Sequence, residues 1–247
     1  MILLKTFEQI EYLKKSNKVV GDVLRLLKKE AKEGVTTFDL DRMAETSILE
    51  NGCIPAFKGY QGFPFTICAS KNNHVVHGFP DKTPLQPGDI LSIDVGACYN
   101  GFYGDAAITV EIGEVPQNVS LLLKTTEYAL HKAISRAIPG NRLFDISYVI
   151  QDIAEDAGFF VIKTHGGHGV GKRLHEMPKV PNYGRANSGP VLKPRMVIAV
   201  EPIVVEKDNN LKLLENKWTY ATRDGKMSAH FEHTILITDN GPEILSI

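Results

Sequence analysis

The sequence predicts an α+β fold made of two similar halves, each with two helices followed by an antiparallel hairpin. Three observations support this fold class. Apolar residues recur at helical spacing early in each half. The dipeptide Asn100-Gly101, a common two-residue hairpin turn, separates two apolar stretches. The helices and strands of the first half recur about 106 positions later. We therefore expect one domain, residues 1–247, with pseudo-repeats at about 1–117 and 118–247.

The first half is predicted to begin with two helices. Residues 6–9 have a capping-box pattern, and the apolar spacing that follows ends near Gly34. A second helix is expected from about Phe38 to the stop at 51–52. A loop at 55–65, a short strand at 66–70 and the hairpin then complete this half.

The second half is predicted to repeat this plan. Helices are expected at 118–137 and 143–157, and strands at 159–164, 196–205 and 231–238. Gly34 and Gly140 match at an offset of 106 positions, as do Asp39 and Asp145.

Four acidic residues fall into register between the halves. At an offset of 107 positions Asp94 matches Glu201, and with 20 further residues inserted Asp105 matches Glu232. Each half would then contribute one acid from each strand of its hairpin. Two sheets meeting around four carboxylates is the expected consequence.

The hairpin at Asn100-Gly101 should bring two of these acids to one face. A two-residue turn pairs Asp94 with Ala107, and Asp105 lies two residues further along the same face. Such diagonal neighbours are roughly 7–8 Å apart. Two carboxylates buried in a sheet do not both stay charged without a cation. The alternative is a pair of exposed hairpin carboxylates.

A histidine and glycine run, residues 165–171, lies between the acidic pairs. Carboxylates with at least one imidazole suit Mn²⁺, Fe²⁺, Co²⁺ or Zn²⁺. Four carboxylates are too many for one zinc ion and suit two metals that share bridging ligands. The run lacks the GxGxxG spacing of a nucleotide-binding turn. The HExxH zinc motif is also absent, because Lys179 stands where its second histidine would be.

Composition excludes several classes of partner. The net charge is −1 with no acidic or basic block, so neither a nucleic acid nor a membrane surface is an expected partner. The three cysteines, Cys53, Cys68 and Cys98, indicate reduced thiols. No apolar run approaches membrane-span length. These features predict a cytoplasmic protein.

Six stretches resemble, in order, the motifs of the type I methionine aminopeptidases, which belong to the pita-bread metallopeptidases. The stretches are ICASKNNHVVHGFP (67–80), GDILSIDVG (88–96), GFYGDAA (101–107), GGHGVGKRLHEMP (166–178), EPIV (201–204) and WTYATRDGKMSAHFEHT (218–234). The resemblance covers nearly the whole chain. It implies the pita-bread (creatinase/aminopeptidase) fold, with antiparallel sheets around a dinuclear metal site in a single catalytic domain.

The resemblance also implies the metal ligands. Asp105 and Glu232 would bridge two divalent cations (Co, Mn, Fe or Zn). Asp94 would complete one ion, and His168 with Glu201 the other. Relatives also have a monovalent-cation site near residues that correspond to Asn72 and Ser228.

The activity implied is removal of the N-terminal methionine from nascent chains whose second residue is small, by attack of a water or hydroxide held between the ions. Glu201 would be the general base, and His77 and His175 would be catalytic residues that contact substrate. The methionine pocket would comprise Tyr60, Phe63, Cys68, His77, Leu174 and Trp218, and His175 would also bind substrate. We expect a monomer acting on nascent polypeptide N-termini. Contact with the ribosome is left open.

Two other functions remain open at this point. One is an Xaa-Pro peptidase of the same fold, which normally has a large additional N-terminal domain. The other is a pita-bread protein that binds peptides without cleaving them. Three positions depart from the family pattern, His74, Leu174 and His230, and none of them removes an expected metal ligand.

Overall fold

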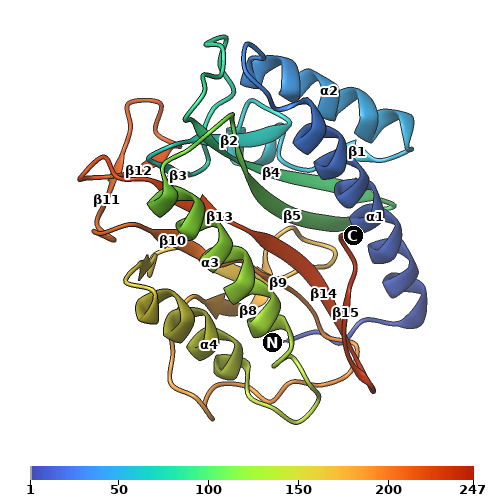
Figure 1. The fold of residues 1–247 in the computed structure, drawn as a ribbon. Helices are drawn as coiled ribbons and strands as arrows, with labels where there is room; N and C mark the ends of the chain where they lie inside the picture. Colours follow the sequence, from blue (N-terminus) through green and yellow to red (C-terminus); the bar gives the residue numbers. More distant parts are fainter. Residues whose placement is uncertain (1) are drawn as a thin grey trace.

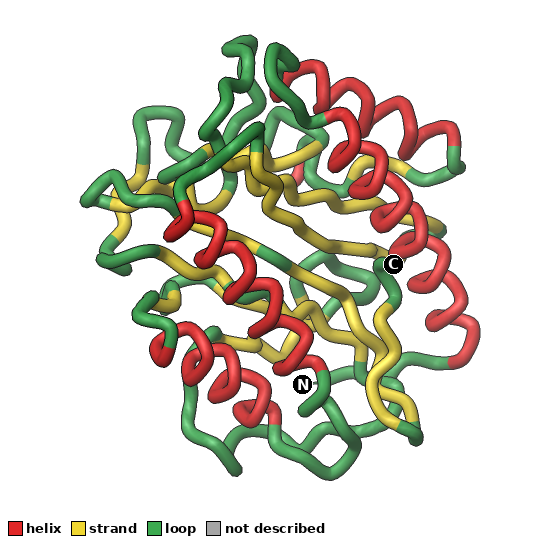
Figure 2. Tube along the Cα trace, in the orientation of Figure 1, coloured by secondary structure: helices red, strands yellow, loops and turns green. Residues whose placement is uncertain are grey.

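The computed structural model describes residues 2–247, and in it the helices lie on one side of a large curved sheet (Figures 1 and 2). The elements of the first half are α1 (Phe7–Glu30), α2 (Thr37–Glu50), β1 (Ile54–Pro55), the 3-10 turn η1 (Tyr60–Gly62), β2 (Ile67–Lys71), β3 (His74–Val76), β4 (Ile90–Tyr99) and β5 (Phe102–Glu111). Helix α1 begins where the sequence predicts, because Gln9 N donates to Thr6 Oγ1 and Thr6 N donates to Gln9 Oε1.

The second half repeats the helices and then adds more strands than the first. Its elements are α3 (Gln117–Ile134), α4 (Leu143–Asp156), β6 (Phe160–Val161), β7 (Gly166–Gly169), β8 (Glu176–Pro181), β9 (Val197–Val200), β10 (Ile203–Val205), β11 (Leu211–Leu213), β12 (Tyr220–Thr222), β13 (Ser228–His230), β14 (Glu232–Thr238) and β15 (Gly241–Ile244). Helices α2 and α4 both have 14 residues and start 106 positions apart, at Thr37 and Leu143.

The sheets of the two halves join into one nine-stranded sheet. Its strand order is β1-β4-β5-β14-β9-β7-β8, with β2 also paired to β4 and β15 to β14. The halves meet where β5 pairs with β14. Two three-stranded sheets, β13-β10-β6 and β11-β12-β3, flank it. The predicted meeting of two sheets is therefore an edge-to-edge pairing of antiparallel strands.

One face of the large sheet packs on the helices. Ile93 and Val95 of β4 lie in the apolar cluster formed with α1 and α2, and Ile198 of β9 and Ile235 of β14 lie in the cluster formed with α3 and α4. Because side chains alternate along a strand, Asp94 points to the opposite face. The metal site that the sequence predicts would therefore lie on the face of the sheet away from the helices.

The hairpin register is confirmed, whereas one strand prediction is wrong. Tyr99 pairs with Phe102, and Asp94 with Ala107. The predicted strand at 196–205 is broken into β9 and β10 at Glu201-Pro202, because proline has no N–H for the ladder. Among residues 2–247, no helix has the length and apolarity needed to cross a membrane.

Candidate metal centre and adjoining cleft

The pairing of β4, β5 and β14 brings three acids to one place on the sheet. Ala107 of β5 pairs with Asp94 on one side and with Glu232 on the other. Asp105 lies two residues from Ala107 on the same strand, so its side chain is on the same face. The register pairs His233 with Val200. Glu201 therefore lies next to Glu232, just beyond the last pair of the β9–β14 ladder.

The backbone of Asp105 is fixed by buried side chains from both halves. Its N–H donates to Asn17 Oδ1 of α1 at 3.3 Å, and its carbonyl accepts from Thr234 Oγ1 of β14 at 2.7 Å. The opposite position on β4 is Gly96, where a Cβ would lie 2.4 Å from the Phe57 ring. The glycine therefore leaves room for an aromatic ring beside this acid.

Glycines on either side of His168 allow its strand to fit between two others. A Cβ at Gly167 would lie 2.1 Å from Ala199 O, and one at Gly169 would lie 2.3 Å from Met177 O. No side chain larger than hydrogen fits at those distances. The sequence predicts close backbone approach in this run, and the packing of β7 between β8 and β9 is that approach.

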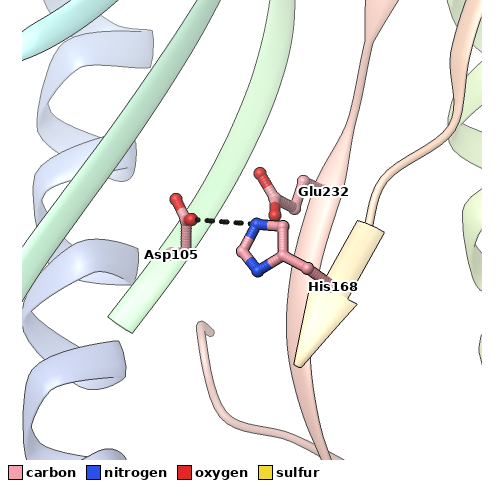
Figure 3. A group of neighbouring side chains, drawn as sticks. All are labelled: Asp105, His168 and Glu232. Carbon is pink, nitrogen blue, oxygen red and sulfur yellow. Dashed lines mark ion pairs between the residues drawn. The ribbon is translucent and has the colours of Figure 1, made fainter. Parts of the chain in front are cut away.

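The side chains of Asp105, His168 and Glu232 converge from three strands (Figure 3). Potential ligand atoms of these three residues all lie within 4.8 Å of one another. His168 Nε2 lies 3.7 Å from Asp105 Oδ2 and 3.7 Å from Glu201 Oε1. These separations are longer than hydrogen bonds. They suit ligand atoms arranged around a common ion.

His230 belongs to the same cluster, which the sequence did not indicate. Its Nε2 lies 3.4 Å from Glu201 Oε2 and 3.7 Å from Glu232 Oε2, so Glu201 has an imidazole on each of its oxygens. Both backbone groups of His230 are bonded to Thr109 Oγ1. The departure from the family pattern at position 230 was visible in the sequence, but its proximity to Glu201 depends on the pairing of β13 with β10.

Buried polar atoms without partners show what this cluster lacks. Asp94 Oδ1, Asp105 Oδ1, His230 Nε2 and Glu232 Oε1 are buried and have no hydrogen-bond partner among residues 2–247. Burial and then the neighbouring carboxylates raise the pKa of Asp105 and Glu232 well above the usual range. Burial also raises the pKa of Asp94, to about 7. Positive charge would satisfy these oxygens and keep them ionised, so the residues fit a site for divalent cations.

A cleft of about 1240 Å³ opens from this cluster, and every predicted substrate residue lines it. Tyr60, Phe63, Cys68, Leu174 and Trp218 form a connected apolar group at one end. The Trp218 ring meets the Phe63 ring edge-on, with centroids 5.2 Å apart. Burial, followed by the Asp94 charge, raises the pKa of the Cys68 thiol well above its usual value. This end of the cleft is therefore aromatic and uncharged.

The two predicted catalytic histidines lie at the cleft in different settings. His77 has a left-handed backbone, φ 57°, and its carbonyl accepts from Thr219 Oγ1 at 3.0 Å. Such strain in a non-glycine residue is typical of functional sites. His175 Nδ1 lies 3.0 Å from the Tyr60 hydroxyl, and its ring centroid lies 4.3 Å from that of His168. Burial lowers the pKa of His77 and of His175 to about 4, so both are neutral at pH 7.

The expected monovalent-cation residues are also adjacent. Ser228 N donates to Asn72 O at 3.0 Å, and Ser228 Oγ is buried without a hydrogen-bond partner in the described part of the chain. The side-chain amide of Asn72 is occupied by Asp89 and by the backbone of Ile90. Because Asn72 Oδ1 already accepts a hydrogen bond from Ile90 N, Ser228 Oγ is the side-chain oxygen of this pair that is left to contact a cation.

The model of metallopeptidase family M24 matches residues 11–239. The chain belongs to this family. Methionine aminopeptidase of Clostridium acetobutylicum is 48% identical over 248 residues, covering 100% of this chain and 99% of the relative. Methionine aminopeptidase 1 of Bacillus subtilis is 45% identical over 246 residues, covering 100% of this chain and 99% of the relative. The predicted resemblance to methionine aminopeptidases is confirmed.

Solved structures confirm the pita-bread fold. The crystal structure of methionine aminopeptidase from Thermotoga maritima has a TM-score of 0.98 and 46% sequence identity, covering 100% of this chain and 99% of that one. Prolidase from Pyrococcus furiosus has a TM-score of 0.81 at 24% identity; the match covers 99% of this chain but 65% of that one. The likeness to prolidase extends to the fold alone.

Proposed function

We propose that this M24 metallopeptidase is a methionine aminopeptidase that removes the N-terminal methionine of nascent proteins when the second residue is small. The observation that carries the proposal is a buried acid and imidazole cluster at the base of an uncharged, aromatic pocket. Whole-length identity to methionine aminopeptidases supports it. We further propose that residues 1–247 act as one catalytic domain, as a monomer in the cytoplasm.

Five residues would hold two divalent cations, from the set Co, Mn, Fe or Zn. These residues would be Asp94, Asp105, His168, Glu201 and Glu232. When bound, such ions lower the pKa of coordinated water and polarise a carbonyl. The unpartnered oxygens of Asp94, Asp105 and Glu232 support this assignment. The unpartnered Ser228 Oγ supports a monovalent cation between Asn72 and Ser228.

Three residues, Glu201, His175 and His77, would act as the general base and the hydrogen-bond donors of peptide hydrolysis. Glu201 takes the proton of the attacking water, and the imidazoles of His168 and His230 on either side support its charged form. His175, neutral and held by Tyr60, donates to the developing oxyanion. His77 faces the scissile amide. Because His77 and His175 are neutral at pH 7, each ring has one N–H that can donate a hydrogen bond without bringing a positive charge into the site.

The methionine side chain would occupy the aromatic end of the cleft. Sulfur gains about 0.3–1.5 kcal/mol from contact with aromatic rings such as Phe63 and Trp218. A charged or β-branched first residue should fit poorly. The second residue would lie against the metal cluster and the histidines, which restricts it to small side chains.

A panel of peptides varied at the first two positions tests the proposal, with products read by mass spectrometry. We expect cleavage of Met-Ala, Met-Gly and Met-Ser peptides, and very slow cleavage of Met-Leu and Met-Lys. Formylated methionine should resist cleavage, because the free amine is needed. Preference for Ala-Pro or Gly-Pro peptides would instead favour an Xaa-Pro peptidase.

A metal titration runs beside the panel. Protein stripped with chelator should lose activity, and each divalent ion added back should restore it to a different extent. Normal cleavage by exhaustively chelated protein would contradict the metal assignment. Absence of cleavage with every ion would favour a peptide-binding protein.

A further inference from the structure

The segment before α1 is tied to the loop that carries His175. Lys5 is buried, and its side chain is 5% exposed. Its Nζ lies 2.5 Å from Glu176 Oε2, and the Glu176 side chain is 9% exposed. A buried lysine without a partner is costly. This ion pair therefore holds together two segments that are 171 positions apart.

Both oxygens of Glu176 are used, and both shape the loop 171–176. While Oε2 meets Lys5, Oε1 accepts the Arg173 N–H at 3.2 Å. The start of the loop is fastened to β5, where Tyr103 N donates to Gly171 O at 3.0 Å. The carboxylate thus closes the turn on which His175 stands, and Lys5 is the charge that holds this carboxylate.

The glycine at position 171 fits this arrangement. A Cβ there would lie within 2.3 Å of Lys5 Nζ and 2.4 Å of Glu176 Oε1. The ion pair therefore lies directly against bare backbone. Lys5 is held from the other side as well, because its N–H donates to Arg195 O at 2.9 Å.

His175 needs this support because, within residues 2–247, its side chain makes one hydrogen bond. That contact is the Tyr60 hydroxyl on Nδ1, at 3.0 Å. One hydrogen bond at Nδ1 leaves the position of Nε2 to be set by the ring contacts and by the backbone that carries the ring. The backbone of the neighbouring residue, Glu176, is held by the ion pair. Displacement by about 1 Å of a group that contacts the reacting atoms can cost roughly a hundredfold in rate.

We propose that the Lys5–Glu176 ion pair positions His175 for peptide cleavage, which makes the N-terminal segment part of the active-site framework. The inference rests on the proposed function, which assigns His175 to the developing oxyanion. Lys5 and Glu176 are positioning residues: they act through His175, and the aromatic wall of the methionine pocket, Phe63 and Trp218, comes from other segments of the chain.

Turnover of a Met-Ala-Ser peptide gives the first measurement. Lys5→Met keeps the aliphatic stem and removes the charge, whereas Glu176→Gln keeps an acceptor for Arg173 N and removes the charge. Each should lower kcat roughly tenfold to a hundredfold. KM and competitive inhibition by free methionine should change much less than kcat, because Phe63 and Trp218 lie outside this loop. Lys5→Arg should recover most of the rate.

The matched control is a second lysine–glutamate pair, whose lysine is on α1. Lys14 Nζ lies 2.9 Å from Glu243 Oε1, but these side chains are 39% and 43% exposed. Lys14→Met and Glu243→Gln should leave kcat unchanged. They remove the same chemistry from a place that touches neither the cleft nor His175.

Histidine-ring NMR gives a readout that does not depend on activity. The ring signals of His175, assigned by their loss in His175→Gln, should shift or broaden in Lys5→Met and Glu176→Gln and stay in place in the Lys14 and Glu243 variants. If Lys5→Met fails to fold, Glu176→Asp keeps the charge but shortens its reach, and the same shift is expected.

Two results would overturn the inference. One is a wild-type kcat in folded Lys5→Met and Glu176→Gln proteins. The other is a lowered kcat with the His175 signals at their wild-type positions. Failure of the wild-type protein to cleave any methionyl peptide would count against the proposed function instead, and the NMR shifts would still decide whether the ion pair positions His175.

Discussion

The two hairpins that carry the acids are closed in different ways. Strands β4 and β5 pair at ten positions and are joined by the two-residue turn Asn100-Gly101. Strands β9 and β14 pair at four positions, and residues 201–231 lie between them. In the first half both acids therefore lie within continuous strands. In the second half Glu201 lies just beyond the end of β9, and Glu232 begins β14.

The difference shows how two similar units have divided the work of building a site. The uninterrupted hairpin holds Asp94 and Asp105 at fixed positions in one ladder. In the second hairpin Glu201 lies outside the ladder, directly before Pro202. The chain between β9 and β14 forms β10 to β13 and the segment with Trp218. The first half thus holds its two acids within one continuous ladder. The second half places its two acids at strand ends and also supplies a wall of the cleft.

The largest expected effect is on turnover, when the charge of Asp105 on β5 or of Glu232 on β14 is removed. Asp105→Asn and Glu232→Gln keep the shapes of these side chains but remove their charges. We expect turnover to fall by more than about a thousandfold in both variants, and bound metal to fall with it. Metal analysis and peptide cleavage check this.

Glu243→Gln, on the neighbouring strand β15, is the control for loss of a carboxylate. It should retain both metal and rate. If only one of Asp105 and Glu232 proves essential, the halves do not contribute equally to the site.

A second prediction concerns Asp94 in metal-free protein. Burial raises its pKa from 3.8 to about 7. The folded state therefore binds more protons than the unfolded state between about pH 4 and pH 7, and the stability that this group contributes falls as pH rises through that range. Asp94→Asn should stabilise the chelated protein by up to about 4 kcal/mol at pH 8 and by little near pH 4.

Urea unfolding of chelated wild-type and Asp94→Asn proteins across this pH range checks the sign. With metal restored, Asp94→Asn should instead be destabilising, because the carboxylate would then serve as a ligand. A difference in stability that does not vary with pH would contradict the raised pKa.

Local sequence signals predict the first half better than the second. The Asn100-Gly101 turn fixed the expected pairing of Asp94 with Ala107, and that pairing is confirmed. The break at Glu201-Pro202 was missed, because the surrounding residues read as one apolar run. Strand β7 was missed because its glycines give no alternation of polar and apolar residues. Contacts such as Asn17 with Asp105, 88 positions apart, arise only from packing.

A third prediction concerns His233, a histidine on the helix side of the sheet whose partner in the other half is an alanine. His233 of β14 pairs with Ala106 of β5. Burial, and then His131, lower the pKa of His233 to about 4. The unfolded state, with a pKa near 6.5, binds the proton first as pH falls. Stability should therefore be lost between about pH 6.5 and pH 4, by about 2 kcal/mol at pH 5.

His233→Gln should remove that part of the pH dependence, as measured by denaturant unfolding at pH 7 and pH 5. His131→Gln is the matched control, since burial is the larger cause of the shift and persists in that variant. A pH dependence unchanged in His233→Gln would mean that His233 does not titrate in this range.

The smallest effect concerns the matching helices α2 and α4. Thr36 Oγ1 accepts the Asp39 N–H at 3.1 Å and caps α2. At the corresponding start of α4, Arg142 has no such side-chain bond, and Asp145 accepts the Arg142 N–H at 2.8 Å instead. Thr36→Ala should therefore cost about 1 kcal/mol. For a chain of this size, that is a fall in Tm of about 2 to 4 °C.

Arg142→Ala should cost less, because the arginine side chain donates one exposed hydrogen bond, to Gly189 O at 3.1 Å. Arg142→Thr should gain stability if the threonine hydroxyl reaches the Asp145 N–H as Thr36 reaches Asp39. Thermal unfolding of the three variants checks the order. Equal losses in the two alanine variants would mean that both helix starts are held by packing on the sheet, because a missing hydroxyl bond at one start would then make no difference.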